Sequence, residues 1–320
     1  MNLADALSWL VGLTAAVGIV TSVRQLGAAA RGWVIVQALL LAAAVAAGAL
    51  RRPELAYAAA AGWVLFVYGP RVAQRRANEL FAAFRFAAAA RWARLAAWLH
   101  PFDDARSQAM LVEAQGEMIR GRYDRARALL ADAERSPRLR DVVRIERLRL
   151  DRDWRSIVAE LDARPRVASN PLLLMPYLRA LGETGDPSRL LATYAKLPAP
   201  FRRVPTVRLV AAAFCGRPDL VRALLDGPLV RDPEPSRVYW LAIAEQASGA
   251  GAVATERLQA LAAGDMLVEQ AKHRLMVPAP LVAPSALSPE ARRTLDALAR
   301  EIRETRAFLS VPPKPRLPAA

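Results

Sequence analysis

The chain has 320 residues, of which 54% are hydrophobic and 23% are charged, and its 45 basic against 30 acidic residues give a formal charge of +15. Its single cysteine, Cys215, excludes an internal disulfide framework. A basic chain could bind nucleic acid. After residue 70 the arginines are scattered over every predicted helix and are not gathered with aromatic residues on one segment, so the sequence argues against nucleic acid as a partner.

Three apolar stretches occupy the N-terminal part of the chain. They run from about Ala6 to Val23, Gly32 to Leu50 and Leu55 to Gly69. The first two reach the roughly 18–20 residues that a helix needs to cross a bilayer core, whereas the third is shorter and is bounded by Pro53 and Pro70. We therefore predict that residues 1–70 form a transmembrane anchor of two to three helices in the lipid bilayer. Gln37 lies inside the second stretch, and we expect it to make one interhelical hydrogen bond.

The distribution of basic residues predicts the orientation of this integral membrane protein. The tail before the first stretch has no basic residue, whereas the segment after Pro70 contains Arg71, Arg75, Arg76, Arg85, Arg91 and Arg94. Because Lys and Arg accumulate in cytoplasmic flanks, residues 71–320 are expected in the cytoplasm. The Arg51–Arg52 pair would then face outward, against the rule.

A helix–turn–helix pattern recurs along the body of the chain. Its first positions are Gly121, Arg152, Gly185, Gly216 and Gly249, so that the pattern returns at nearly even steps of about 31–33 residues. Glycine allows the chain to turn out of a helix without a Cβ clash. One helical hairpin cannot bury its apolar face alone, but a stack of hairpins can.

The first copy resembles a tetratricopeptide repeat, because Ala114, Gly121, Tyr123, Ala126 and Pro137 stand where that family places its small, turn and terminating residues. The resemblance covers residues 105–263 and implies an α-solenoid. Later copies drift, since Arg152 replaces the glycine, and an irregular α-solenoid of unrelated ancestry stays open. We assign a structural role in the repeat turns to Gly121, Tyr123, Ala126, Trp154, Gly185, Gly216 and Gly249.

The predicted fold is therefore all-α, with N-terminal transmembrane helices followed by a tetratricopeptide-like α-solenoid. Residues 71–104 have the apolar stripe of an amphipathic juxtamembrane helix, which either lies on the membrane surface or forms a first, degenerate hairpin that caps the solenoid; we favour the cap. Residues 264–310 are expected to form a linker and a helix that starts at Ser288-Pro289-Glu290. Residues 311–320 form a proline-rich tail.

The sequence offers little catalytic chemistry. We expect His100 to cap a helix end or to be solvated, His273 to be exposed and Cys215 to be a packing residue. No second histidine or cysteine stands at metal-ligand spacing, and no Gly-x-Ser occurs. Gly249 to Ala254 matches the letters of a dinucleotide fingerprint, but the segment before it reads as a helix instead of the required strand. We predict no catalytic, cofactor-binding or metal site.

The layout as a whole resembles the N-terminal, non-catalytic half of certain bacterial rhomboid-family intramembrane serine proteases. Apolar N-terminal segments lead to an arginine-rich helix that ends Trp98-Leu99-His100-Pro101, and the repeats lead to a helix that ends at Leu309 before a basic, proline-rich stretch. The resemblance implies a bacterial inner membrane and a six-helix catalytic domain that would follow at about Pro318. No catalytic residue of that family has a matching position here.

Two functions follow from these patterns. The first is a non-catalytic, membrane-anchored scaffold whose stacked hairpins bind an unidentified cytoplasmic protein or peptide. The second is the regulatory N-terminal half of a rhomboid-like protease whose catalytic domain is missing or is supplied by another chain.

Overall fold

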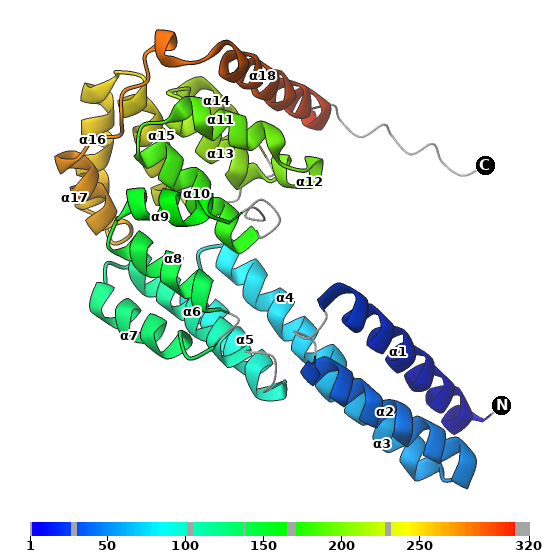
Figure 1. Ribbon diagram of the computed structural model, residues 1–320. Helices are drawn as coiled ribbons and strands as arrows, with labels where there is room; N and C mark the ends of the chain where they lie inside the picture. The colour runs from blue at the N-terminus through cyan, green and yellow to red at the C-terminus, as the bar shows by residue number, and fades with distance from the viewer. Residues whose placement is uncertain are drawn as a thin grey trace. The chain divides into compact units, whose positions relative to one another are not determined.

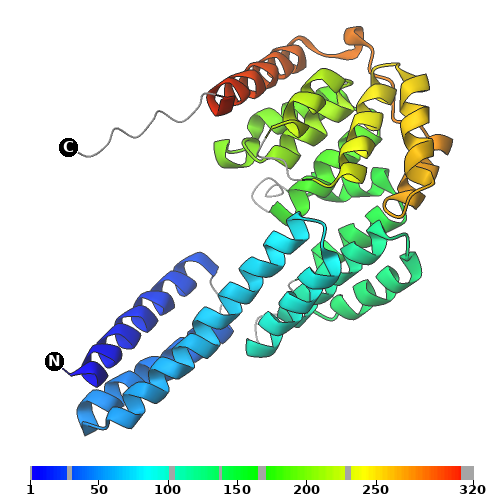
Figure 2. The ribbon, with the colours of Figure 1, turned by 180° about the vertical axis from the view of Figure 1, so that it is seen from behind.

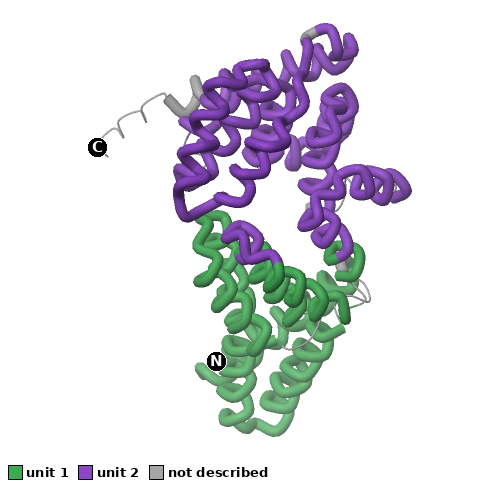
Figure 3. Tube along the Cα trace, turned by 90° about the vertical axis from the view of Figure 1, so that its left-hand side faces the viewer, with its two compact units in different colours: residues 1–116, 124–143 green, residues 117–123, 144–320 purple. Residues whose placement is uncertain are grey.

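The computed structural model describes residues 2–26, 31–100, 105–136, 139–164, 171–227 and 232–310, and every regular element among them is helical (Figure 1). The predicted Pro137 terminator and the proline-rich tail lie outside the described residues. The chain forms two compact units. Unit 1 comprises residues 1–116 and 124–143, and unit 2 comprises residues 117–123 and 144–320 (Figure 3).

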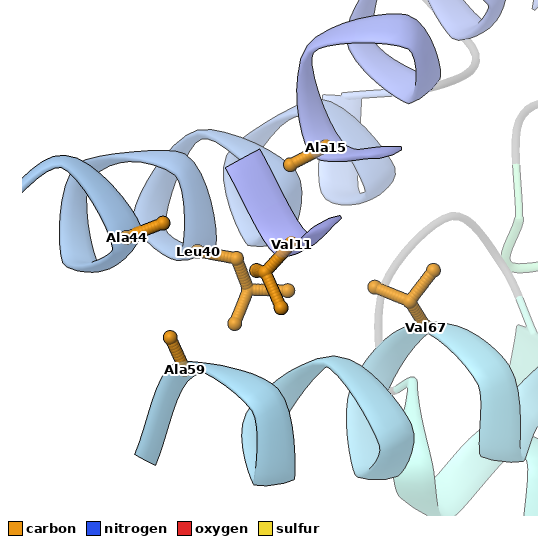
Figure 4. Packing of buried hydrophobic residues seen from close by; sticks show 6 residues of the cluster. All are labelled: Val11, Ala15, Leu40, Ala44, Ala59 and Val67. Atoms are coloured by element: carbon orange, nitrogen blue, oxygen red, sulfur yellow. The ribbon is translucent and has the colours of Figure 1, made fainter. Parts of the chain in front are cut away.

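Unit 1 begins with three helices that pack on one another: α1 (Leu3–Leu26), α2 (Arg31–Leu50) and α3 (Pro53–Trp63). Three segments, Leu3–Arg24, Arg31–Leu50 and Pro53–Ala82, are long and apolar enough to cross a membrane. Alanines make up half of the buried cluster where the helices touch, and small residues are typical of contacts between helices in lipid. Figure 4 shows this cluster, which consists of Val11, Ala15, Leu40, Ala44, Ala59 and Val67.

Pro70 does not end the third helix, although the sequence placed a boundary there. A π-helical turn, η2 (Val64–Tyr68), leads directly into α4 (Gly69–Ala82), and the Gly69 N–H donates to the Val64 carbonyl. Proline lacks an N–H and its ring clashes with the carbonyl four residues earlier in a regular α-helix. The wider π turn removes that conflict, so the helix continues for 30 residues from Pro53 to Ala82.

The amphipathic segment after the anchor is two helices rather than one. Helix α4 ends before Phe84, which has a positive φ of 57°, and α5 (Phe86–Leu99) packs back along α4. Buried Ala77, Ala93 and Ala109 join α4 and α5 to α6 (Ala105–Ile119). The structure thus contains a hairpin of α4 and α5 here, and its role as a cap of the solenoid stays a prediction.

The expected interhelical hydrogen bond of Gln37 is wrong. Its side chain is 1% exposed, and neither its Oε1 nor its Nε2 has a hydrogen-bond partner among the described residues. The amide occupies the space beside Gly18, where an added Cβ would overlap it. The missing side chain of Gly18 therefore makes room for the amide, but it supplies no donor or acceptor.

The remaining helices follow the predicted hairpin order (Figures 1 and 2). They are α7 (Tyr123–Ala133), α8 (Arg140–Leu150), α9 (Trp154–Asp162), α10 (Pro171–Glu183), α11 (Pro187–Lys196), α12 (Ala199–Arg202), α13 (Pro205–Phe214), α14 (Pro218–Leu225), α15 (Glu234–Ala247), α16 (Gly251–Ala262), α17 (Val268–Met276), the 3-10 turn η4 (Pro284–Ala286) and α18 (Pro289–Ser310). In unit 2, α10 packs on α13 and α13 on α15, while α18 packs on α11 and α14.

A left-handed residue stands at each of the five predicted turns. The φ angles are 74° at Gly121, 58° at Arg152, 77° at Gly185, 64° at Gly216 and 88° at Gly249. This conformation ends a helix and suits glycine, because a Cβ is strained there. Arg152 adopts it nonetheless, and its Nη2 donates to the carbonyl of Glu269 at 3.3 Å.

The segment between α17 and α18 is not a free linker. We call residues 277–288 the strap. Its Val282 N–H donates to the Ala247 carbonyl at 2.9 Å, and the Ser188 hydroxyl donates to the Ala286 carbonyl at 3.2 Å. Pro280 and Leu281 lie against the turns at Gly185 and Gly249. The C-terminal part of unit 2 therefore runs along the hairpin turns.

We predict that Gly182→Ala destabilises unit 2. A Cβ built on Gly182 of α10 would overlap the ring of Phe214 on α13, and Phe214 is 2% exposed. Such overpacking typically costs about 1–3 kcal/mol. Thermal unfolding of the full chain in detergent measures the loss. Gly251→Ala is the matched control, because nothing lies within 4 Å of its added Cβ. Equal midpoints for the two variants would contradict this packing.

Candidate functional site

Six charged and aromatic side chains meet inside unit 2. Helix α10 supplies an arginine and a glutamate, α15 a tyrosine and a tryptophan, α17 an arginine and α9 a tryptophan. We call them the arginine–tryptophan cluster: Trp154, Arg179, Glu183, Tyr239, Trp240 and Arg274. Arg179 and Glu183 share one face of α10 because they are four residues apart.

The innermost part of the cluster is a buried ion pair. Arg274 and Glu183 have side chains that are 3% and 4% exposed, and Arg274 Nη2 donates to Glu183 Oε2. Arg274 Nη1 also donates to the Val277 carbonyl at 3.4 Å, and its guanidinium carbon lies 6.0 Å from the centre of the Phe214 ring. A charge this deeply buried is tolerated only when it is paired and hydrogen-bonded.

Arg179 forms the outer part of the cluster. Its Nε donates to Glu183 Oε1 at 3.3 Å and its Nη2 to the Tyr239 hydroxyl at 3.2 Å. Its guanidinium carbon lies 5.4 Å from the ring centre of Trp154 and 5.9 Å from that of Trp240. The side chain is 23% exposed, so the guanidinium is held in place by the two tryptophans while part of it still reaches solvent.

The electrostatic environment of the cluster is positive. Glu183 is its only carboxylate and is shared by Arg179 and Arg274. Burial, together with the charges of Arg152 and Arg274, lowers the pKa of the neighbouring His273. Burial is the larger cause of this lowered pKa, and the two arginines add to it.

This arrangement is suited to binding. Half-buried tryptophan rings offer apolar contact area, and a guanidinium that is oriented by its neighbours can donate to a carboxylate. Tryptophan, tyrosine and arginine are also the residues that carry most of the energy at protein interfaces. The cluster therefore has the composition of a contact point for an acidic protein or peptide segment.

The residues predicted from the repeat pattern lie at the turns, and only Trp154 belongs to the cluster. Gly121 is closely approached by the Glu269 side chain, and Gly216 by the backbone of Ala247. The Tyr123 hydroxyl lies 3.4 Å from Arg152 Nη2 as an acceptor, and Ala126 is fully buried.

The other five cluster residues were missed by the sequence analysis. Their partners stand on helices far apart in the chain, and Glu183 and Arg274 are separated by 91 residues. The only local signal was the four-residue spacing of Arg179 and Glu183, which is common on exposed helix faces.

The side chains considered for catalysis have other environments. Cys215 is 4% exposed, and burial raises the pKa of its thiol to about 12. A buried, protonated thiol is a poor nucleophile and packs like a small apolar side chain. His100 follows α5 but is buried against Trp33, with ring centres 4.0 Å apart, so a solvated role is wrong. His273, expected to be exposed, is half-buried. The described residues contain no group of three His, Cys, Asp or Glu that could hold a metal.

No family model, curated protein or solved structure matches this chain. The resemblances to tetratricopeptide repeats and to rhomboid N-terminal halves stay predictions from the sequence.

We predict that Glu183→Leu destabilises the chain strongly. The substitution leaves Arg274 buried without its carboxylate, and removing one partner of a buried ion pair typically costs about 3–5 kcal/mol. The double variant Glu183→Leu, Arg274→Met should recover much of this loss, because the charge that remains without its carboxylate is then that of Arg179, whose side chain is 23% exposed. Denaturant unfolding of the full chain measures both effects.

Asp132→Asn serves as the control for that prediction. It removes the carboxylate from the pair with Arg135, in which the side chains of Arg135 and Asp132 are 83% and 49% exposed. Exposed pairs contribute about 0–1 kcal/mol. A loss for Glu183→Leu no larger than that of Asp132→Asn would show that the buried pair contributes little to stability.

Proposed function

We propose that this chain is a membrane-anchored helical-repeat scaffold that holds a cytoplasmic protein or peptide partner and has no catalytic site of its own. The observation that carries the proposal is the partly exposed Arg179, which is held between Trp154 and Trp240 in a positive environment. The anchor would keep the bound partner at the membrane surface.

A tetratricopeptide-like α-solenoid is the architecture that we propose for residues 105–263. Two observations support it: the left-handed residue at each of the five turns, and the serial packing of α10, α13 and α15. In such an array, each hairpin buries its apolar face against its neighbours, and a continuous surface remains for a ligand. The arginine–tryptophan cluster spans α9, α10, α15 and α17, so a partner bound there would contact several hairpins.

We predict that Trp240→Ala releases the partner. Truncation of a central tryptophan at an interface typically costs about 2 kcal/mol or more, which corresponds to a loss of more than tenfold in affinity. Quantitative affinity capture of the full chain from its own membranes compares the wild type with this variant. Val253→Ala is the matched control, because Val253 on α16 is an exposed apolar side chain outside the cluster.

The capture experiment separates the two functional hypotheses. Proteins retained by the wild type and by Val253→Ala, but lost with Trp240→Ala, support the scaffold. An identical set for all three chains, or one that survives deletion of residues 105–263, contradicts it. Recovery of a rhomboid-like catalytic domain as that partner, together with serine-hydrolase probe labelling only when both chains are present, would favour the regulatory-half alternative.

We also propose that residues 71–320 lie in the cytoplasm of a bacterial cell, with the anchor in the inner membrane. If all three candidate segments span, the residues after Ala82 lie on the opposite side from Asn2, and the arginines that follow Pro70 favour the cytoplasmic side. A reporter that is active only in the periplasm should be silent when fused after Ala320 and active when inserted between Arg51 and Arg52. The reverse pattern would contradict this orientation.

A further inference from the structure

A pocket of about 570 Å³ lies in unit 1 beside the end of the anchor. It is lined by residues of α2, α4 and α5 and by the start of α6. Those that matter here are Trp33, Arg71, Gln74, Asn78, His100 and Gln108. We call it the juxtamembrane pocket. We propose that it binds the phosphate of an anionic phospholipid headgroup, an inference that does not depend on the scaffold proposal.

The level of the pocket relative to a bilayer can be estimated from the lengths of the helices. Two distances along the helices are equal: that from Trp33, near the start of α2, to its end at Leu50, and that from Pro53, where the next helix begins, to Pro70. Each distance corresponds to almost five helical turns, or about 25 Å from the far end of the helical hairpin, which is close to the thickness of a bilayer core. Trp33 and Arg71 therefore stand at the level of the lipid headgroups.

Arg71 supplies the charge that would recognise a phosphate. Its guanidinium carbon lies 5.4 Å from the centre of the Trp33 ring, which holds the side chain at the pocket. Within the described part of the chain, Arg71 has no carboxylate partner. The nearby Glu79 is already engaged by Arg75 at 3.1 Å and by Arg76 at 3.0 Å. Among the described residues that line the pocket, Arg71, Arg75 and Glu79 together carry a net charge of +1.

The polar lining provides hydrogen-bond donors. Gln74 and Asn78 lie one turn apart on α4, and Gln74 Nε2 donates to Asn78 Oδ1 at 3.0 Å, which leaves the amide group of Asn78 available to a ligand. Gln108 adds a third carboxamide from α6. A guanidinium together with amide donors forms the usual set for a phosphate oxygen.

The surrounding aromatic residues favour a lipid over a soluble phosphate. Trp98 of α5 is 75% exposed and lies two residues before His100, whose ring stacks on Trp33. Tryptophan is enriched at the headgroup level of membranes because its ring is apolar and its N–H is polar. Basic residues next to a membrane span are also attracted to anionic lipids. A lipid whose headgroup enters the pocket would keep its acyl chains beside the anchor.

Native mass spectrometry of the full chain tests this inference. The chain is released from nanodiscs that contain equal amounts of phosphatidylglycerol and phosphatidylcholine, and the retained lipids are counted. We expect the wild type to retain phosphatidylglycerol preferentially, and Arg71→Gln to reduce that retention at least about fivefold. Arg71→Lys, which keeps the positive charge, should restore part of it. Arg52→Gln is the matched control, because it removes one arginine between α2 and α3, at the opposite end of the hairpin.

Each outcome decides the question. Equal retention of the two lipids, or equal losses for Arg71→Gln and Arg52→Gln, overturns the proposal. A second arm adds millimolar glycerol phosphate to the nanodisc sample before release. Persistence of bound phosphatidylglycerol supports a lipid as the source of the phosphate. Displacement of the lipid by glycerol phosphate, with the same dependence on Arg71, would instead assign the pocket to a soluble phosphate ester and overturn the lipid.

Discussion

The buried carboxylate of Glu183 is the constraint on which the arrangement of unit 2 depends. It pairs with Arg274 of α17 and with Arg179 of its own helix, so α17 cannot leave α10 without exposing an unpaired charge inside the protein. The buried Gln246 adds a second connection, because its Nε2 donates to the Arg274 carbonyl at 3.1 Å and its Oε1 accepts from the Ala279 N–H at 3.0 Å. Directional polar contacts thus fix the position of α17 and of the strap.

Because α17 and the strap are fixed in this way, they pack closely against two turn glycines and leave no room for a larger side chain there. At Gly185 the chain has a positive φ, and an added Cβ would also meet Pro280 of the strap at 3.2 Å. At Gly121 an added Cβ would meet the Glu269 side chain of α17 at 2.8 Å. The turn residues therefore satisfy a local backbone requirement and a long-range packing requirement together. A repeat pattern that appears local in the sequence is in this way coupled to the C-terminal end of unit 2.

The features that the sequence predicted correctly are those that depend on neighbouring residues. Runs of apolar residues marked the three candidate spans, and glycines at a nearly constant spacing marked turns that are indeed left-handed. The arginine–tryptophan cluster could not be predicted, because Arg179 meets Tyr239 from 60 residues away. The helix end predicted at Pro70 was wrong for a different reason. A π turn relieves the clash of the proline ring, and such a turn has no signal in the local sequence. The burial of His100 likewise depends on the distant Trp33.

The three N-terminal helices and unit 2 are suited to different solvents, because among the described helices only the former are long and apolar enough to cross a membrane. The contact between these helices includes the small residues Ala15, Ala44 and Ala59. Close packing of this kind would hold helices together in lipid, where bringing them together brings no hydrophobic gain. Large apolar side chains, among them Leu13 and Leu39, remain exposed on their outer surface. In unit 2 the hydrophobic effect favours burial of the apolar side chains, and the paired charges select one arrangement of the helices. At the juxtamembrane pocket, where we propose that lipid gives way to water, Arg71 and Trp33 combine a charge with an apolar ring.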